Sequence, residues 1–169
     1  MMETIIRPYQ LTDIEACRAL WAELTQAHRD LYEDQTIGGE NPGAGFDRHL
    51  ANPQLVALWV AEAGGQVVGL TGLLVCEEEA EIEPLVVAAG HRAHGIGRRL
   101  LDQAMSEARA RGIRFLSVRP VARNAAAIAL FVEAGFRLLG QIDLFQDLDA
   151  SSERRWVDGV TLHGHRLRY

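Results

Sequence analysis

The feature that most constrains this chain is a short glycine-containing loop at residues 92–97, which reads Arg-Ala-His-Gly-Ile-Gly. The segment before it, residues 80–88, is predicted to be a strand because branched apolar residues recur in it. After the loop, apolar residues recur on one face of a helix that ends near Gly112, namely Ile96, Leu100, Leu101, Ala104, Met105 and Ala108. The loop therefore joins the end of a strand to the start of a long helix.

This placement suits an anionic ligand. The first four N–H groups of a helix lack an internal partner, and the helix dipole makes the N-terminus partly positive. The glycines at positions 95 and 97 remove side chains that would keep a phosphate away from the backbone. A pyrophosphate is the natural ligand of such a loop.

The spacing narrows the choice of pyrophosphate ligand. A P-loop ends in Gly-Lys-Ser/Thr, whereas this loop ends in Gly97-Arg98-Arg99. A dinucleotide fingerprint needs a third glycine where Leu100 stands. What remains is the pattern R-x-x-G-x-G after a strand, and an ordinary glycine-containing helix start without a ligand stays open as the alternative.

The rest of the chain predicts one domain, residues 1–169, of the α/β (α+β) class. The predicted strands cover residues 4–7, 55–61, 67–75, 80–88, 113–118, 136–148 and 160–169. Helices are predicted from a capping box at Thr12 and Glu15, around residues 27–34, from residue 96, and over residues 124–134. We expect a mixed, mostly antiparallel central sheet of about seven strands with helices on both faces.

Composition and charge limit the partners. No apolar stretch reaches membrane-spanning length, no signal peptide is apparent, and two distant cysteines form no disulfide framework, so we expect a cytoplasmic protein without membrane association. Residues 1–90 carry 15 acidic and four basic side chains, a net charge of −11, whereas residues 91–169 carry eight and 13, a net charge of +5. The acidic half argues against duplex nucleic acid and favours a cationic partner, although chance clustering of charges is the alternative.

A second motif follows at residues 124–136, with the sequence Asn-Ala-Ala-Ala-Ile-Ala-Leu-Phe-Val-Glu-Ala-Gly-Phe. Together with the R-x-x-G-x-G loop and the strand meander, it resembles the GCN5-related N-acetyltransferase (GNAT) family. The resemblance covers essentially the whole chain from Ile5 onward. It implies a GNAT-like fold, acetyl-CoA as cosubstrate and an amine as acetyl acceptor.

The resemblance also implies roles for single residues. The backbone of residues 85–87 would bind the pantetheine arm as an added strand would, and the loop would bind the pyrophosphate. Asn124 would contact pantetheine, and Phe131 would lie near the thioester sulfur. The implied cofactor-binding residues are Leu85, Val86, Val87, Arg92, Ala93, His94, Gly95, Ile96, Gly97, Arg98, Asn124 and Phe131.

The acid–base chemistry points to carboxylates. An amine with a pKa near 10.4 is almost entirely protonated at neutral pH, so a general base is needed more than an acid. Glu83 and Glu81 precede the cofactor strand, and alternation places both on one face. We expect Glu83 to be the base, with Glu81 second; two solvated strand carboxylates are the alternative. Pro84 cannot donate to a strand ladder and therefore predicts a bulge that opens a slot.

One position departs from the family pattern. Many GNAT enzymes carry a tyrosine that protonates the leaving sulfur at the position of Phe131, and phenylalanine cannot do so. We therefore expect an N-acetyltransferase that works by direct attack in a ternary complex, with no metal. Two alternatives stay open, a non-catalytic acyl-CoA-binding regulatory domain and a nucleotide-binding module. The acceptor would be a small-molecule or peptide amine, and a homodimer is left open.

Overall fold

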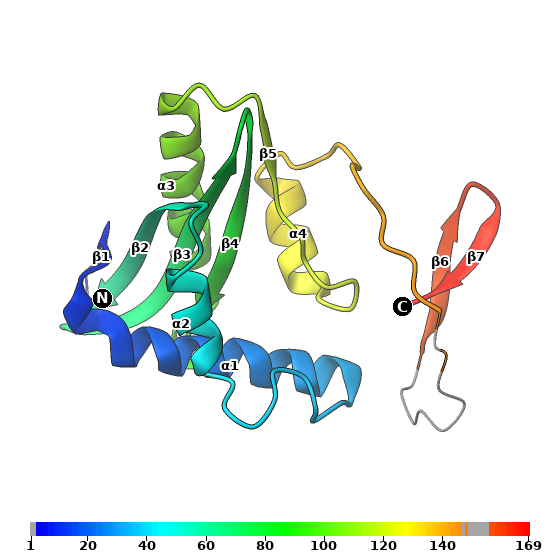
Figure 1. Cartoon of the computed structure of the whole chain (residues 1–169), viewed down its shortest axis with the longest axis horizontal. Coiled ribbons are helices and arrows are strands. Elements are labelled where there is room, and N and C mark those ends of the chain that lie inside the picture. Colours follow the sequence, from blue (N-terminus) through cyan, green and yellow to red (C-terminus); the bar gives the residue numbers. More distant parts are fainter. Residues whose placement is uncertain (1–2, 147, 149–155) are drawn as a thin grey trace.

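The computed structural model describes residues 3–146, 148 and 156–169, and its centre is a twisted five-stranded sheet (Figure 1). The strand order is β1-β2-β3-β4-β5, with β1 to β4 antiparallel and β5 parallel to β4. The strands are β1 (Thr4–Pro8), β2 (Leu55–Ala63), β3 (Gln66–Cys76), β4 (Glu79–Val87) and β5 (Phe115–Ser117). The predicted meander and the mixed, mostly antiparallel sheet are confirmed.

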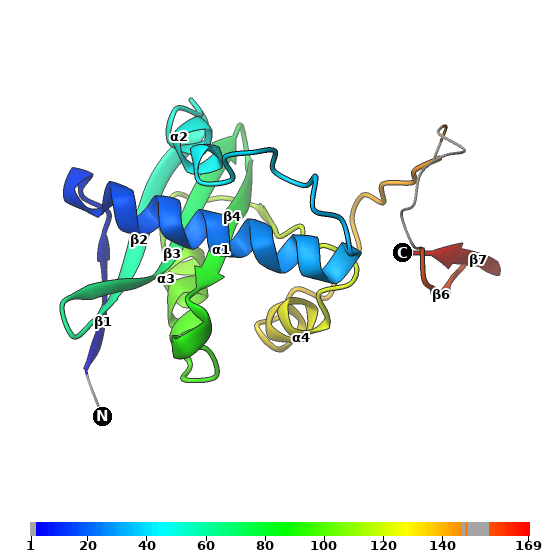
Figure 2. The same ribbon diagram turned by 90° about the horizontal axis from the view of Figure 1, so that it is seen from below.

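Helices cover both faces of this sheet, as predicted (Figures 1 and 2). The helices are α1 (Ile14–Tyr32), α2 (Ala44–Leu50), α3 (Ile96–Ala110) and α4 (Ala125–Glu133), with short 3-10 turns η1 (Leu11–Asp13) and η2 (Ala89–His91). One core cluster joins α1 and α2 to the sheet through Cys17, Leu20, Phe46, Val60, Leu70 and Val86. A second cluster joins α3 and α4 to the opposite face through Trp59, Leu73, Ile82, Leu101, Ala104 and Phe131. In the described part of the chain, no helix combines the length and apolarity needed to cross a bilayer.

The N-terminal region differs from the prediction in three ways. The helical stretch expected around residues 27–34 is the second half of one continuous helix, α1. The capping box expected at Thr12 and Glu15 lies earlier, at the start of η1, where Gln10 is the N-cap. The Asp13 carboxylate accepts hydrogen bonds from the Gln10 N–H and the Arg7 guanidinium, each at 2.8 Å. Helix α2 was not predicted at all.

The C-terminal region corrects the expectation of two closing strands. In the described part of residues 136–148, no strand forms, because Gly140 and the adjacent pair Leu138-Leu139 break the alternation that would give a single apolar face. Residue 147 of that predicted strand lies outside the described residues. In place of the single strand predicted over residues 160–169, two short strands, β6 (Asp158–Leu162) and β7 (His165–Arg168), pair with each other as a separate hairpin. The central sheet therefore has five strands, not seven.

Candidate functional site

Strands β4 and β5 form a fork. Their parallel pairing is confined to Glu79–Glu81 against Phe115–Ser117. Beyond that point β4 continues to Val87, while β5 ends at Ser117 and the chain leaves the sheet (Figure 1). Among the described residues, no strand therefore pairs with this edge of β4 over residues 85–87, where a pantetheine arm was expected.

A bulge lies at the point where the fork opens. Between β3 and β4, Thr71 is paired with Leu85 and Leu73 with Ile82, so that Glu83 and Pro84 together lie opposite the single residue Gly72. This is the irregularity predicted from Pro84. It changes which face of the sheet successive β4 side chains meet: Ile82 joins the α3 cluster, whereas Val86 joins the α1 cluster.

The glycine-containing loop follows β4 directly and ends in the first turn of α3. Ala93 and Gly95 both have left-handed backbones, with φ of 61° and 75°, and Gly95 is the N-cap of α3. Within the described residues, none of the backbone N–H groups of residues 93–98 donates a hydrogen bond. Six successive free donors at a helix N-terminus are groups that could donate hydrogen bonds to an anion.

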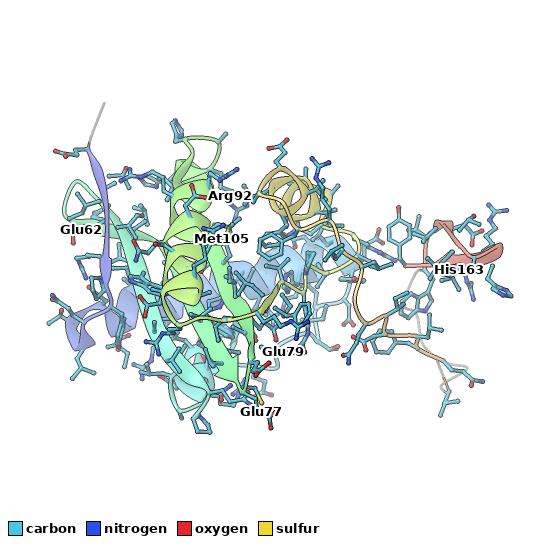
Figure 3. The ribbon with its side chains drawn as sticks, turned by 90° about the horizontal axis from the view of Figure 1, so that it is seen from above. Glu62, Glu77, Glu79, Arg92, Met105 and His163 are labelled. Atoms are coloured by element: carbon cyan, nitrogen blue, oxygen red, sulfur yellow. The ribbon has the colours of Figure 1, made fainter. Side chains whose placement is uncertain are left out.

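The side chains of the loop are held within the protein. Arg92 donates through Nε to the Val87 carbonyl (2.8 Å) and through Nη2 to the Glu23 carboxylate on α1 (2.9 Å), and Figure 3 shows it beside α3. Arg98 pairs with Asp102 at 2.9 Å. The Arg92 N–H is bonded to the Ala89 carbonyl at 3.3 Å, so the free run begins at residue 93 and not at Arg92 as expected. The backbone of the loop, rather than its arginines, is available to a ligand.

The second motif lies next to the loop. Asn124 caps α4, because its Oδ1 accepts a hydrogen bond from the Ala127 N–H at 3.0 Å. A Cβ placed on Gly97 would lie 3.5 Å from Leu130 of α4, which brings the two motifs into contact. Phe131 is buried and meets Phe136 edge to face, with 5.9 Å between ring centroids. The two sequence motifs thus flank the open fork.

The two candidate bases have different surroundings. Glu81 is half-buried, and its Oε2 lies 2.6 Å from Nη1 of Arg119, which follows β5. Burial raises the pKa of Glu81, Arg119 acts in the opposite direction, and the nearby Glu83 raises it further. Glu83 is exposed and makes no ion pair or side-chain hydrogen bond within the described residues. Glu83 is therefore the carboxylate that is free to accept a proton.

Two other kinds of site, a metal centre and a cysteine nucleophile, receive no support from the described residues. None of them forms a group of three or more histidine, cysteine, aspartate or glutamate side chains that could hold a metal ion. Cys17 is fully buried, and burial raises the pKa of its thiol to about 12. A thiol held neutral in this way is a poor nucleophile.

Three residues near the site were missed in the sequence. Glu23 accepts hydrogen bonds from the Ala89 N–H and from Arg92, and His49 on α2 lies against the β4 bulge. No local sequence pattern marks Glu23 or His49, because each of them contacts residues that are far away along the chain. Arg119 could have been found, since it directly follows a predicted strand that runs parallel to the one carrying Glu81.

Comparison with known proteins gives an independent view of the fold. A sequence model of the Acetyltransferase (GNAT) family matches residues 14–136. The chain belongs to the GNAT acetyltransferase family. It is accordingly an N-acetyltransferase of a family that uses acetyl-CoA, and the resemblance seen in the sequence is confirmed. The family match includes both motifs and ends at Phe136, before the C-terminal region that departs from the predicted sheet.

Individual relatives show the same kinship. The N-alpha-acetyltransferase RimI of Mycobacterium tuberculosis is 35% identical over 114 residues, which cover 64% of this chain and 70% of that protein. A ribosomal-protein-alanine N-acetyltransferase from Brucella melitensis has a similar structure, with a TM-score of 0.64 and 29% identity over 80% of this chain and 86% of that one. The aminoglycoside N-acetyltransferase AAC(6')-Iy in complex with CoA has a TM-score of 0.65 over 88% of this chain and 97% of that one, but only 17% identity, which establishes a common fold alone.

Proposed function

We propose that this GNAT enzyme transfers the acetyl group of acetyl-CoA to a primary amine by direct attack within a ternary complex. The observation that carries the proposal is the run of six free backbone N–H groups at residues 93–98, beside the open fork of β4 and β5. An anion bound at the run would place the rest of a CoA molecule along the open edge of β4.

The donor half of the site would use both motifs. The pyrophosphate would accept hydrogen bonds from the loop backbone, and the pantetheine arm would pair with the open edge at residues 85–87 as an added strand does. The Asn124 amide nitrogen can donate to the arm while its oxygen caps α4. Buried Phe131 would cover the thioester from the side of the α3 cluster.

The catalytic half would use Glu83 as general base. It stands exposed at the bulge where the fork opens, whereas Glu81 is occupied by Arg119. Glu83 would take a proton from the ammonium group, directly or through one water, and the neutral amine would then attack the thioester carbonyl. The C–S bond breaks as the amide forms, the sulfur leaves as a thiolate, and the second proton of the attacking nitrogen passes to water. With a thiol pKa of about 8.5, the thiolate is a tolerable leaving group, so the missing tyrosine at Phe131 does not prevent turnover.

The acceptor would be a cationic small molecule or a peptide N-terminus. The first half of the chain, which supplies α1, α2 and the first strands, carries a net charge of −11. These acidic residues include Glu77, in the turn before β4, and Glu79, at the start of β4, both at the closed end of the fork in Figure 3. A cationic amine would be attracted toward these carboxylates over about 8 Å at physiological salt. The likeness to the N-alpha-acetyltransferase RimI favours a peptide N-terminus among such amines.

The test is release of free CoA thiol from acetyl-CoA in the presence of matched cationic, neutral and anionic amines and basic peptide N-termini. We expect turnover, with kcat/KM higher for cationic acceptors and the difference reduced at high salt. Equal kcat/KM for cationic and anionic acceptors would contradict the acceptor class.

A second candidate is favoured by the phenylalanine at position 131, which removes a proton donor. A regulatory domain would bind acetyl-CoA in calorimetry yet release no thiol with any acceptor. Tighter binding of ATP than of CoA would instead favour the nucleotide-binding alternative.

A further inference from the structure

Helix α2 carries a buried histidine with a free ring nitrogen. His49 is 6% exposed, and its ring lies 5.1 Å from that of Trp21 on α1, centroid to centroid. Its Nε2 is fully buried and has no hydrogen-bond partner within the described residues. A buried polar atom without a partner lowers the stability of the fold, so an apolar side chain would be the more stable choice here.

The free nitrogen lies at the β4 bulge. A Cβ placed on Gly72 would lie 3.1 Å from Nε2 of His49 and 2.5 Å from the carbonyl oxygen of Glu83. The imidazole and that carbonyl therefore both lie beside the same glycine, which is the only β3 residue opposite the two bulged residues Glu83 and Pro84. Glycine is required at position 72 because any side chain would displace the Glu83 carbonyl.

The protonation state suits a hydrogen-bond donor. Burial lowers the pKa of His49, and the backbone of Glu83 has the opposite, smaller effect. The Glu83 carbonyl lies near the ring, but no hydrogen bond joins it to Nε2 in the described residues. A neutral imidazole protonated at Nε2 would donate to this carbonyl after a small movement.

We propose that His49 is a positioning residue for the proposed general base. Its Nε2–H holds the Glu83 carbonyl over Gly72, fixes the bulge, and so fixes the direction of the Glu83 carboxylate toward the fork. This inference rests on the proposed function, because it gives His49 a role in catalysis rather than in folding. It also explains why a buried ring nitrogen is kept where the fold alone would favour an apolar residue.

The test compares three variants by thermal unfolding, by acetyl-CoA affinity in calorimetry, and by kcat. His49→Leu exchanges this donor for apolar packing, so it should fold with a melting temperature near that of wild type and bind acetyl-CoA within about twofold of wild type. It should nevertheless lose roughly tenfold to a hundredfold in kcat, as expected for a misplaced catalytic group. His49→Gln, which retains a donor, should recover most of that loss. His165→Leu, which removes an imidazole from the separate C-terminal hairpin, is the matched control and should leave kcat unchanged.

Any result other than these would count against either the role of His49 or the proposed function. An unchanged kcat in His49→Leu, a failure of that variant to fold, or a failure of His49→Gln to recover activity would overturn the inference. A wild-type protein that binds acetyl-CoA but acetylates no amine would refute the proposed function instead, and the two failures are therefore distinguishable.

Discussion

A glutamate introduced at Gly97 should separate cofactor binding from folding. Gly97 lies in the first turn of α3, and a Cβ placed there meets Leu130 at 3.5 Å and Val87 at 3.7 Å, both ordinary contacts. Its backbone is not left-handed, so a side chain introduces no strain. An acidic residue in the first turn of a helix is worth about 0.3–1 kcal/mol of stability. Gly97→Glu should therefore fold as well as wild type or slightly better.

The same carboxylate should exclude the pyrophosphate. A unit charge about 5 Å from a phosphate is repelled by about 3 kcal/mol per unit of phosphate charge at an effective dielectric constant of about 20. Since about 1.4 kcal/mol changes an affinity tenfold, binding should weaken by at least roughly a hundredfold. Gly97→Ala adds the Cβ without the charge and should keep near-normal affinity.

Calorimetric titration with acetyl-CoA and thermal unfolding measure the two effects independently. We expect a lost titration signal and an unchanged or raised melting temperature for Gly97→Glu, with both quantities near wild type for Gly97→Ala. An affinity for acetyl-CoA within about threefold of wild type in Gly97→Glu would refute the assignment of the loop to pyrophosphate. A lowered melting temperature would refute the reasoning about the open position.

Three further outcomes follow from the site. Glu83→Gln should lower kcat most at low pH and remove the acidic limb of the pH–rate profile, whereas Glu81→Gln should leave that limb in place; the reverse result would make Glu81 the base. Phe131→Tyr should leave the acetyl-CoA affinity unchanged and raise kcat by no more than about tenfold, because sulfur protonation is not limiting. A larger gain in kcat, measured by release of the CoA thiol, would contradict the argument that the sulfur leaves as a thiolate. Burial lowers the pKa of both His28 and His49, so below about pH 6.5 the unfolded chain takes up protons that the folded chain does not, and the free energy of unfolding should fall as pH drops. In urea titrations this slope should be shallower for His49→Leu than for wild type, and an unchanged slope would contradict the depressed pKa.

The parts of the fold that sequence could predict are those encoded locally. The loop at residues 92–97 is a run of consecutive residues between a strand and a helix, and Gly97 leaves the open position that was expected there. The β2–β3 turn at Gly64-Gly65 and the bulge at Pro84 are likewise set by backbone properties of single residues. These features need no knowledge of distant packing, and each was predicted.

Helix α2 escaped prediction because packing, not local preference, creates it. A Cβ at Gly45 would lie 2.1 Å from the Trp21 ring, so the glycine that weakens the helix locally is the one that lets it lie against α1. Arg18 and Asp47 then join the two helices at 2.9 Å. The meeting of His49 with Glu83 depends on this docking, which no pattern within α2 reveals.

The strand expected at residues 136–148 was predicted wrongly for a different reason, because apolar residues in a segment do not by themselves supply a packing partner. Leu138, Leu139, Leu144 and Phe145 are apolar, which suggested a buried strand, but they remain exposed in the structure. The hairpin β6–β7 closes on itself through the left-handed turn His163-Gly164 and needs no partner from the central sheet. Strand propensity identifies such segments but does not say to which neighbour they pair.

The three-residue pairing of β4 with β5 has a consequence for local opening. The hairpins β2–β3 and β3–β4 join neighbouring segments over most of their length, whereas β5 returns to the sheet only after α3 and is held by the pairs from Glu79 to Glu81. Three further contacts supplement them: the Ser117 hydroxyl donates to the Ala80 carbonyl at 3.1 Å, Arg119 pairs with Glu81 at 2.6 Å, and the Arg114 N–H donates to the Glu78 carbonyl at 3.2 Å. The amides of β5 should therefore exchange with solvent faster than those of the meander, because a short ladder far apart in sequence opens at a small cost in free energy. A ligand that bridged both arms of the fork would slow that exchange, so amide protection at Leu116 would report occupancy of the site without any turnover.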